Sequence, residues 1–224
     1  MAIALVAAAG SGERLGGDPP KAFAIAAGRP LAEWCLRALA ASASVEAAVI
    51  AAPPGYERAL AALAAEAAPD LTVTVVAGGE SRSQSVANAL AAAADEVVVV
   101  HDAARPLVTA QLVDRCVERL ARWRCDGVVA AARATDTVKE ADAGGRVIAT
   151  FERSSLWLIQ TPQVFRADAL RRAFASGDLT RATDDAQLVE ENGGDVRVVE
   201  APRENLKVTT GTDLRIAELL LAGR

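Results

Sequence analysis

Short apolar runs alternate with longer amphipathic stretches along most of this 224-residue chain. The runs predict strands, and the clearest is Val97–Val100, which is β-branched and apolar throughout. Such alternation favours an α/β fold: a Rossmann-like, mostly parallel sheet with helices on both faces. The predicted strands are Ile3–Ala8, Val45–Ala51, Leu71–Val76, Val97–His101, Gly127–Ala132 and Val196–Glu200; the predicted helices lie near Leu31–Ala41, Glu57–Ala67, Ser83–Ala94 and Ala110–Trp123.

One segment breaks this alternation. Residues Thr137–Thr150 include few large apolar side chains, and their pattern predicts a β-hairpin with Ala143–Gly145 as its turn. A lone two-stranded ribbon is marginally stable in water. We therefore expect an arm at about 136–160 to project from the body and pack on a second copy of the chain; the alternative is a mobile surface hairpin. The length otherwise predicts a single domain, 1–224.

Composition narrows the possible partners. The net charge of −5 and the absence of a basic tract argue against nucleic acid as a partner. An anionic substrate stays possible if the cations are focused in one cleft. Cys35, Cys116 and Cys125 form no Cys-x-x-Cys pair, which predicts buried, reduced thiols and a cytoplasmic location. The apolar run at the N-terminus is too short for a signal peptide or a membrane span, so no membrane partner is expected.

The loop after the first predicted strand is rich in glycine and carries two cations. Gly10 and Gly12 allow backbone N–H groups to approach a ligand, and Arg14 and Lys21 add positive charge. Donors and cations together suit a polyphosphate. The loop lacks the Gly-Lys-Ser/Thr of a Walker A motif, and Leu15 occupies the third glycine position of a dinucleotide-binding fingerprint. A plain strand-to-helix turn is the alternative.

Two more loops are expected at the same edge of the sheet, because ligands in such folds bind beyond the carboxyl ends of the strands. These loops are Gly78–Arg82 and His101–Pro106. Asp102 closes its strand, where a carboxylate suits a metal ion or a ribose hydroxyl, or caps the turn. His101 is the only histidine, so there is no histidine cluster for zinc and no catalytic triad without this residue.

These residues belong to an ordered set of motifs that resembles the 2-C-methyl-D-erythritol 4-phosphate cytidylyltransferases. The set comprises residues 7–16 with Pro20-Lys21, 78–86, 100–106, 161–165, 183–186 and 205–210. Its most specific member is His-Asp-Ala-Ala-Arg-Pro at 101–106, and the motifs follow one another in order along nearly the whole length of the chain. Ala22 departs from the pattern, since the family often has glutamine there.

The resemblance implies an activity and an architecture. The family transfers CMP from CTP to 2-C-methyl-D-erythritol 4-phosphate and releases pyrophosphate, using Mg²⁺ or another divalent cation, in the non-mevalonate route to isoprenoid precursors. Its members have the fold of the nucleotide-diphospho-sugar transferases. They are homodimers in which a hairpin arm reaches over the partner. The resemblance therefore implies CTP, methylerythritol phosphate and a second copy of the chain as partners.

The resemblance also implies roles for particular residues. The catalytic set would be Arg14, Lys21, Arg153 and Lys207, with Arg14 and Lys21 stabilising charge on the triphosphate. The CTP-binding set would be Ala8, Ala9, Gly10, Gly12, Gly79, Glu80, Ser85, Asp102 and Ala103. The acceptor would be held by Arg105, Thr137, Thr161 and Thr183 with Lys207, and Arg153 and Thr161 would come from the partner's arm region. Asp102 would border the metal, mostly through the CTP phosphates.

The reaction that the resemblance implies is compatible with the residue types that this chain contains. The acceptor phosphate is already an anionic nucleophile at neutral pH, so a chain with one histidine and no triad needs no strong general base. Cations must instead offset the repulsion between two anions and hold the attack in line. Three alternatives remain open: a cytidylyltransferase for another polyol phosphate such as ribitol 5-phosphate, an NAD(P)-dependent oxidoreductase, and a non-catalytic nucleotide-binding regulator.

Overall fold

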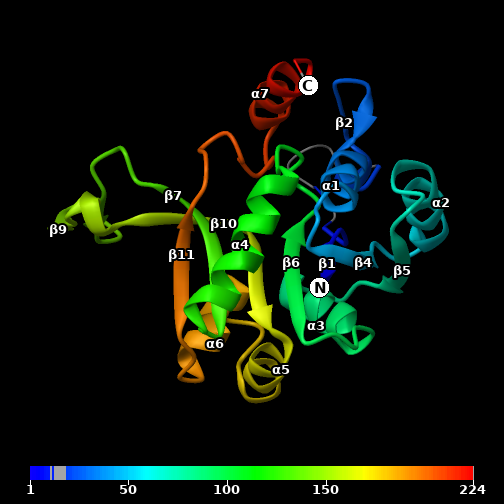
Figure 1. The fold of residues 1–224 in the computed structure, drawn as a ribbon. Coiled ribbons are helices and arrows are strands. Elements are labelled where there is room, and N and C mark those ends of the chain that lie inside the picture. Colours follow the sequence, from blue (N-terminus) through cyan, green and yellow to red (C-terminus); the bar gives the residue numbers. More distant parts are fainter. Residues whose placement is uncertain (11, 13–18, 224) are drawn as a thin grey trace.

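The computed structural model describes residues 1–10, 12 and 19–223. Within them, seven strands form a central sheet in the order β11-β7-β10-β6-β1-β4-β5 (Figure 1). Its strands are β1 (Ala2–Ala7), β4 (Val45–Ala52), β5 (Thr72–Ala77), β6 (Val97–Asp102), β7 (Gly127–Arg133), β10 (Trp157–Arg166) and β11 (Val196–Glu200). All six predicted strands are present. The additional strand, β10, runs antiparallel to both of its neighbours.

Helices cover the sheet on both faces, as the alternation predicts. They are α1 (Leu31–Ala40), α2 (Glu57–Ala67), α3 (Arg82–Ala91), α4 (Ala110–Trp123), α5 (Ala167–Ser176) and α6 (Asp185–Glu191), whereas α7 (Gly211–Leu221) lies beyond the upper edge of the sheet (Figure 1). Short 3₁₀ turns lie at Lys21–Phe23 and Arg153–Ser155, and β2 (Ile25–Ala26) pairs with β3 (Arg29–Pro30). None of the helices that the structure describes is long and apolar enough to cross a membrane.

Two hydrophobic cores, one on each face, hold the sheet in place. In β1 the side chains alternate, so that Val6 packs toward α1, α2 and α4 while Leu5 packs toward α3, α5 and α6. This burial on both sides is the reason that the strands are continuous apolar runs. The parallel strands point upward in Figure 1, toward α7, so their carboxyl ends gather at the upper edge of the sheet.

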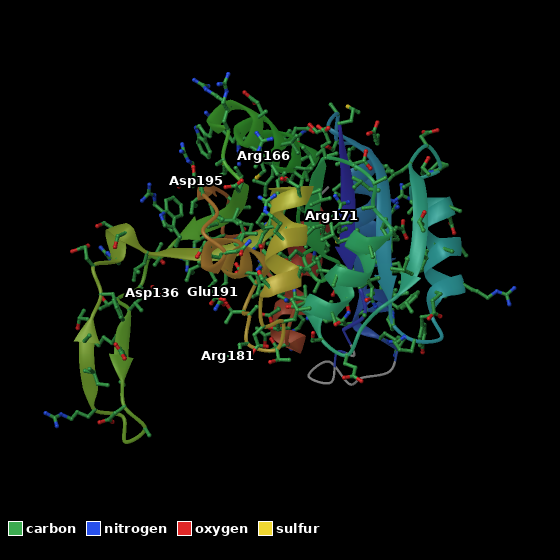
Figure 2. The ribbon with its side chains drawn as sticks, turned by 90° about the horizontal axis from the view of Figure 1, so that it is seen from below. Asp136, Arg166, Arg171, Arg181, Glu191 and Asp195 are labelled. Atoms are coloured by element: carbon green, nitrogen blue, oxygen red, sulfur yellow. The ribbon has the colours of Figure 1, made fainter. Side chains whose placement is uncertain are left out.

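The predicted hairpin is present as an arm. Its strands are β8 (Lys139–Ala141) and β9 (Val147–Thr150), and the turn between them includes Gly145, whose φ of 81° favours glycine. The arm leaves the body on the side of the edge strand β11 (Figure 1). Seen from below, it stands clear of the body, with Asp136 at its root (Figure 2).

A close cross-strand contact generates a test of this packing. Gly127 in β7 pairs with Phe165 in β10, and a Cβ at Gly127 would lie 2.8 Å from the Phe165 ring. Because the fully buried ring has little room to move, Gly127→Ala should lower the free energy of unfolding by about 1–3 kcal/mol. Urea denaturation monitored by circular dichroism measures this change.

Gly211→Ala is the matched control, because nothing lies within 4 Å of a Cβ at this first residue of α7. It should raise stability slightly, by roughly 0.4–1 kcal/mol, since alanine restricts the unfolded chain. A Gly127→Ala protein as stable as the wild type would contradict the proposed clash.

Candidate active site

A cavity of about 470 Å³ lies at the carboxyl ends of β1, β5 and β6. The three loops that the sheet rule selects all contribute to it. Of the site residues predicted from the sequence, it is lined by Ala8, Ala9, Gly10, Gly12, Lys21, Gly79, Glu80, Ser85, Asp102, Ala103 and Lys207. Arg14 lies outside the described residues. The predicted nucleotide-binding residues thus come together, although their individual roles stay predictions.

The glycine-rich loop brings its backbone against Lys21. Gly12 has a φ of 72°, and a Cβ there would lie 2.7 Å from the Cβ of Lys21. Both the dihedral angle and the close approach therefore require glycine. Lys21 begins the 3₁₀ turn after Pro20 and lines the cavity. The backbone at Gly12 and the side chain of Lys21 are therefore in close contact beside the cavity.

The loop before α3 is shaped by glycines and one serine. A Cβ at Gly78 would lie 2.2 Å from the Cβ of Ala9, so the loop packs against the glycine-rich loop. The buried Ser85 hydroxyl accepts a hydrogen bond from the Gly79 N–H at 3.0 Å and donates one to the Ser81 carbonyl at 2.9 Å. Ser85 therefore fixes the shape of the loop, and the exposed Glu80 follows directly after Gly79.

Asp102 is the centre of an ion-pair network at the cavity floor. Its Oδ1 accepts from Arg82 Nε at 2.7 Å, and its Oδ2 lies 2.7 Å from Lys207 Nζ. Arg82 Nη1 in turn lies 2.8 Å from Asp185 Oδ2. Although burial of Asp102 acts in the opposite direction, the two cations hold the pKa of its carboxyl far below the usual range. Asp102 is therefore ionised at neutral pH.

His101 and Thr161 lie beneath the cavity and support it. The Thr161 hydroxyl accepts from the Asp102 N–H at 3.1 Å, so its proton is available to His101 Nδ1 at 2.9 Å. This arrangement assigns the His101 proton to Nε2, which lies 3.3 Å from the Arg105 carbonyl. Burial lowers the pKa of His101 to about 4, so the ring is neutral at pH 7. Thr161 therefore orients the backbone of Asp102 within its own chain.

The other predicted acceptor residues do not line this cavity in one chain. Arg105 binds the carbonyls of Asn205 at 2.8 Å and Ile159 at 3.4 Å. Thr183 is exposed and is bonded to Gln187, while the exposed Arg153 donates to the Thr135 carbonyl. Thr137 is exposed at the root of the arm.

Two charged residues of the site, Arg82 and Asp185, were not predicted from the sequence. Arg82 lines the cavity and pairs with Asp102. It lies in the motif 78–86, in which roles were predicted only for Gly79, Glu80 and Ser85. Asp185, in the matched segment 183–186, was also assigned no role; it is the first residue of α6, after the N-cap Asp184, which accepts from the Gln187 N–H. The signal that could have identified Arg82 was its place in the loop after the third predicted strand.

A metal ion has few protein ligands here. Among the described residues, no group of three or more His, Cys, Asp or Glu side chains could hold an ion. Asp102 and Glu80 are the acidic residues in the described part of the cavity lining. One or two carboxylates suit Mg²⁺ that is bound mainly through substrate phosphates. The residues present therefore fit a cation that arrives with a nucleotide.

Comparisons with known proteins agree with this geometry. The family model described as IspD, 2-C-methyl-D-erythritol 4-phosphate cytidylyltransferase, matches residues 2–223. A relative of that name from Chromobacterium violaceum is 42% identical, covering 99% of this chain and 98% of its own length. One from Rubrobacter xylanophilus is also 42% identical, covering 100% and 96%.

Solved structures of similar fold agree with this family match. The 4-diphosphocytidyl-2C-methyl-D-erythritol synthase of Anaerococcus prevotii superposes with a TM-score of 0.84 at 27% identity, covering 99% of this chain and 98% of that one. The 2-C-methyl-D-erythritol 4-phosphate cytidylyltransferase of Thermus thermophilus gives 0.78 at 36% identity, covering 97% of each chain. With its whole length matched, the chain belongs to the 2-C-methyl-D-erythritol 4-phosphate cytidylyltransferase family.

Proposed function

We propose that this chain, in the cytoplasm, transfers CMP from CTP to 2-C-methyl-D-erythritol 4-phosphate and releases pyrophosphate. The observation that carries the proposal is the cavity, where the glycine-rich loop, Lys21, the Gly79–Glu80 loop, Asp102 and Lys207 meet. The names of the relatives supply the acceptor, since no described contact distinguishes it from another polyol phosphate.

The residues of the cavity suit charge stabilisation and orientation of the reactants. The reaction brings an anionic phosphate oxygen onto the α-phosphorus of an anionic triphosphate. Lys21 and the backbone of the glycine-rich loop would bind the triphosphate, while Lys207, at the opposite carboxylate oxygen of Asp102, would meet the acceptor phosphate. Because His101 is buried and neutral, the chain has no histidine base at the cavity, and the ionised nucleophile requires none.

A divalent cation, preferably Mg²⁺, is part of this proposal. Asp102, with Glu80 nearby in the lining, would hold it while the phosphates supply the remaining ligands. When bound, the ion neutralises charge on the triphosphate and orients it. The protein itself contributes the ionised state of Asp102, which Arg82 and Lys207 maintain.

We also propose that the chain acts as a homodimer through its arm. Val147, Ile148 and Phe151 of the arm are 51%, 61% and 45% exposed, and Leu158 at the start of β10 is 50% exposed. Large apolar side chains on a projecting ribbon favour burial against another surface. Thr137 and Arg153, which lie on the arm, would then complete the acceptor pocket of the partner.

The substrate assignment is tested by measuring pyrophosphate release from CTP with each acceptor. We expect turnover with 2-C-methyl-D-erythritol 4-phosphate and Mg²⁺, and its loss when EDTA removes the cation. Ribitol 5-phosphate is the control acceptor. Turnover with ribitol 5-phosphate alone would reject the proposed acceptor, and binding of NADH without CTP would reject the enzyme class.

Alanine substitutions of the two lysines at the cavity should change different kinetic constants. Lys21→Ala should lower kcat by about 10²–10³, because a preorganised charge at the reacting phosphate is lost. Lys207→Ala should raise the KM for the acceptor more than the Kd for CTP. Arg172→Ala, which removes an exposed cation paired with Asp168 on α5, should leave steady-state rates unchanged. A Lys21→Ala enzyme near the wild-type kcat contradicts the triphosphate role.

Size-exclusion chromatography with light scattering tests the dimer. The wild type should elute as a dimer, and Ile148→Asp with Phe151→Asp should give a monomer because charges cannot be buried without partners. Leu219→Asp is the control: Leu219 is 78% exposed on α7, away from the arm, and its change should leave the dimer intact. A monomeric wild type would refute the arm-mediated dimer.

A further inference from the structure

The ion-pair network includes one charged residue that does not line the cavity. Arg82, Asp102 and Lys207 all line it, whereas Asp185, the first residue of α6, is 0% exposed behind Arg82. Its Oδ2 lies 2.8 Å from Arg82 Nη1. By hydrogen-bond geometry, neither Arg82 Nη1 nor either carboxylate oxygen of Asp185 has a partner among the described residues, so the two side chains are joined by an ion pair.

A carboxylate in this position is costly for folding. Burial raises the pKa of Asp185, because the charged form loses its hydration and Arg82 compensates only in part. Replacing both members of a buried ion pair by well-packed neutral groups is often neutral or stabilising, so a buried pair is weak evidence of a role in stability. The geometry of the ion pair therefore has to be considered for a role other than fold stability.

The geometry of Arg82 gives the charge a role. Arg82 Nε binds Asp102 Oδ1 at 2.7 Å while its Nη1 faces Asp185, so two carboxylates engage one planar guanidinium. A guanidinium with one nitrogen in a hydrogen bond and another in an ion pair has less freedom to rotate, and this restricts the carboxylate that it binds. The other oxygen of Asp102 faces Lys207.

We propose that Asp185 is a positioning residue for the transfer reaction: it holds the guanidinium of Arg82 from behind the cavity and so fixes Asp102 and the ammonium group of Lys207. This role rests on the proposed function. Without the charge of Asp185, the guanidinium keeps only its contact with Asp102, so its plane can rotate and the carboxylate of Asp102 is held less firmly. Lys207, which is held by the other oxygen of Asp102, is then less precisely placed for the acceptor.

The proposal predicts a separation of kcat from nucleotide binding. Asp185→Asn should lower kcat by about tenfold or more, because small displacements of reacting groups are costly. It should not weaken the Kd for CTP, since it removes a negative charge near an anionic ligand. The melting temperature should be largely retained, because Arg82 stays paired with Asp102 and is not left as an uncompensated buried charge.

A double-mutant cycle tests whether Asp185 acts through Arg82. Arg82→Gln should lower kcat, and adding Asp185→Asn to it should lower kcat no further. The control is Asp114→Asn, which alters a carboxylate on α4 bonded to Ser42 and the backbone of Ser44, away from the cavity. The control should lower the melting temperature without changing kcat.

Three results would overturn the positioning role: a wild-type kcat for Asp185→Asn, additive losses in the double variant, or a loss of kcat that tracks a fall in melting temperature. If Asp185→Asn does not fold, Asp185→Ser replaces it under the same criteria. Wild-type turnover, measured first, decides the proposed function separately.

A readout without substrate covers the case in which the wild type transfers no CMP. The Nε–H of Arg82, assigned in ¹⁵N NMR spectra by its loss in Arg82→Gln, should have a high order parameter in the wild type. In Asp185→Asn the order parameter should fall below 0.6, the range of flexible groups. An unchanged order parameter would overturn the positioning role whatever the substrate is.

Discussion

The buried negative charge of Asp102 is the constraint on which the site depends. Asp102 ends β6, a central strand, and an ionised carboxylate is tolerated there only if cations reach it. The two cations come from distant parts of the chain, Arg82 at the start of α3 and Lys207 in the segment before α7. Satisfying one charge therefore fixes the relative placement of three segments, and these segments form the floor of the cavity.

The parallel strands were predictable because burial on both faces leaves continuous apolar runs such as Val97–Val100. The antiparallel β10 was missed for the converse reason. Its middle contains Gln160, Thr161 and Gln163, which are buried only because they bond to other segments: Gln163 to Asp184, and Gln160 to Asn205. Such tertiary hydrogen bonds leave no periodic pattern in the sequence, so no hydropathy pattern could identify this strand.

In the candidate site, too, some residues could be predicted from the sequence and others could not. Gly12 and Gly79 were predictable because loops at the carboxyl ends of parallel strands follow from the fold class. Arg82 and Asp185 were not, because their significance lies in a contact between residues 103 positions apart, between α3 and α6. Local patterns explain Asp185 as part of a helix start, and the adjacent Asp184 does cap the helix. This pairing between two helices on the same face of the sheet became visible only in three dimensions.

The two substrates are served unequally by a single chain. The residues expected to bind CTP line one cavity, whereas Arg105, Thr137, Arg153 and Thr183, expected at the acceptor, lie outside it. Two of the latter are on the arm, which stands clear of its own body (Figure 2). If a partner's arm completes the acceptor pocket, loss of the dimer should impair use of the acceptor and spare CTP binding. A preformed nucleotide half and an assembled acceptor half would then couple dimerisation to turnover, and Lys207, held at Asp102, would lie at the boundary between them.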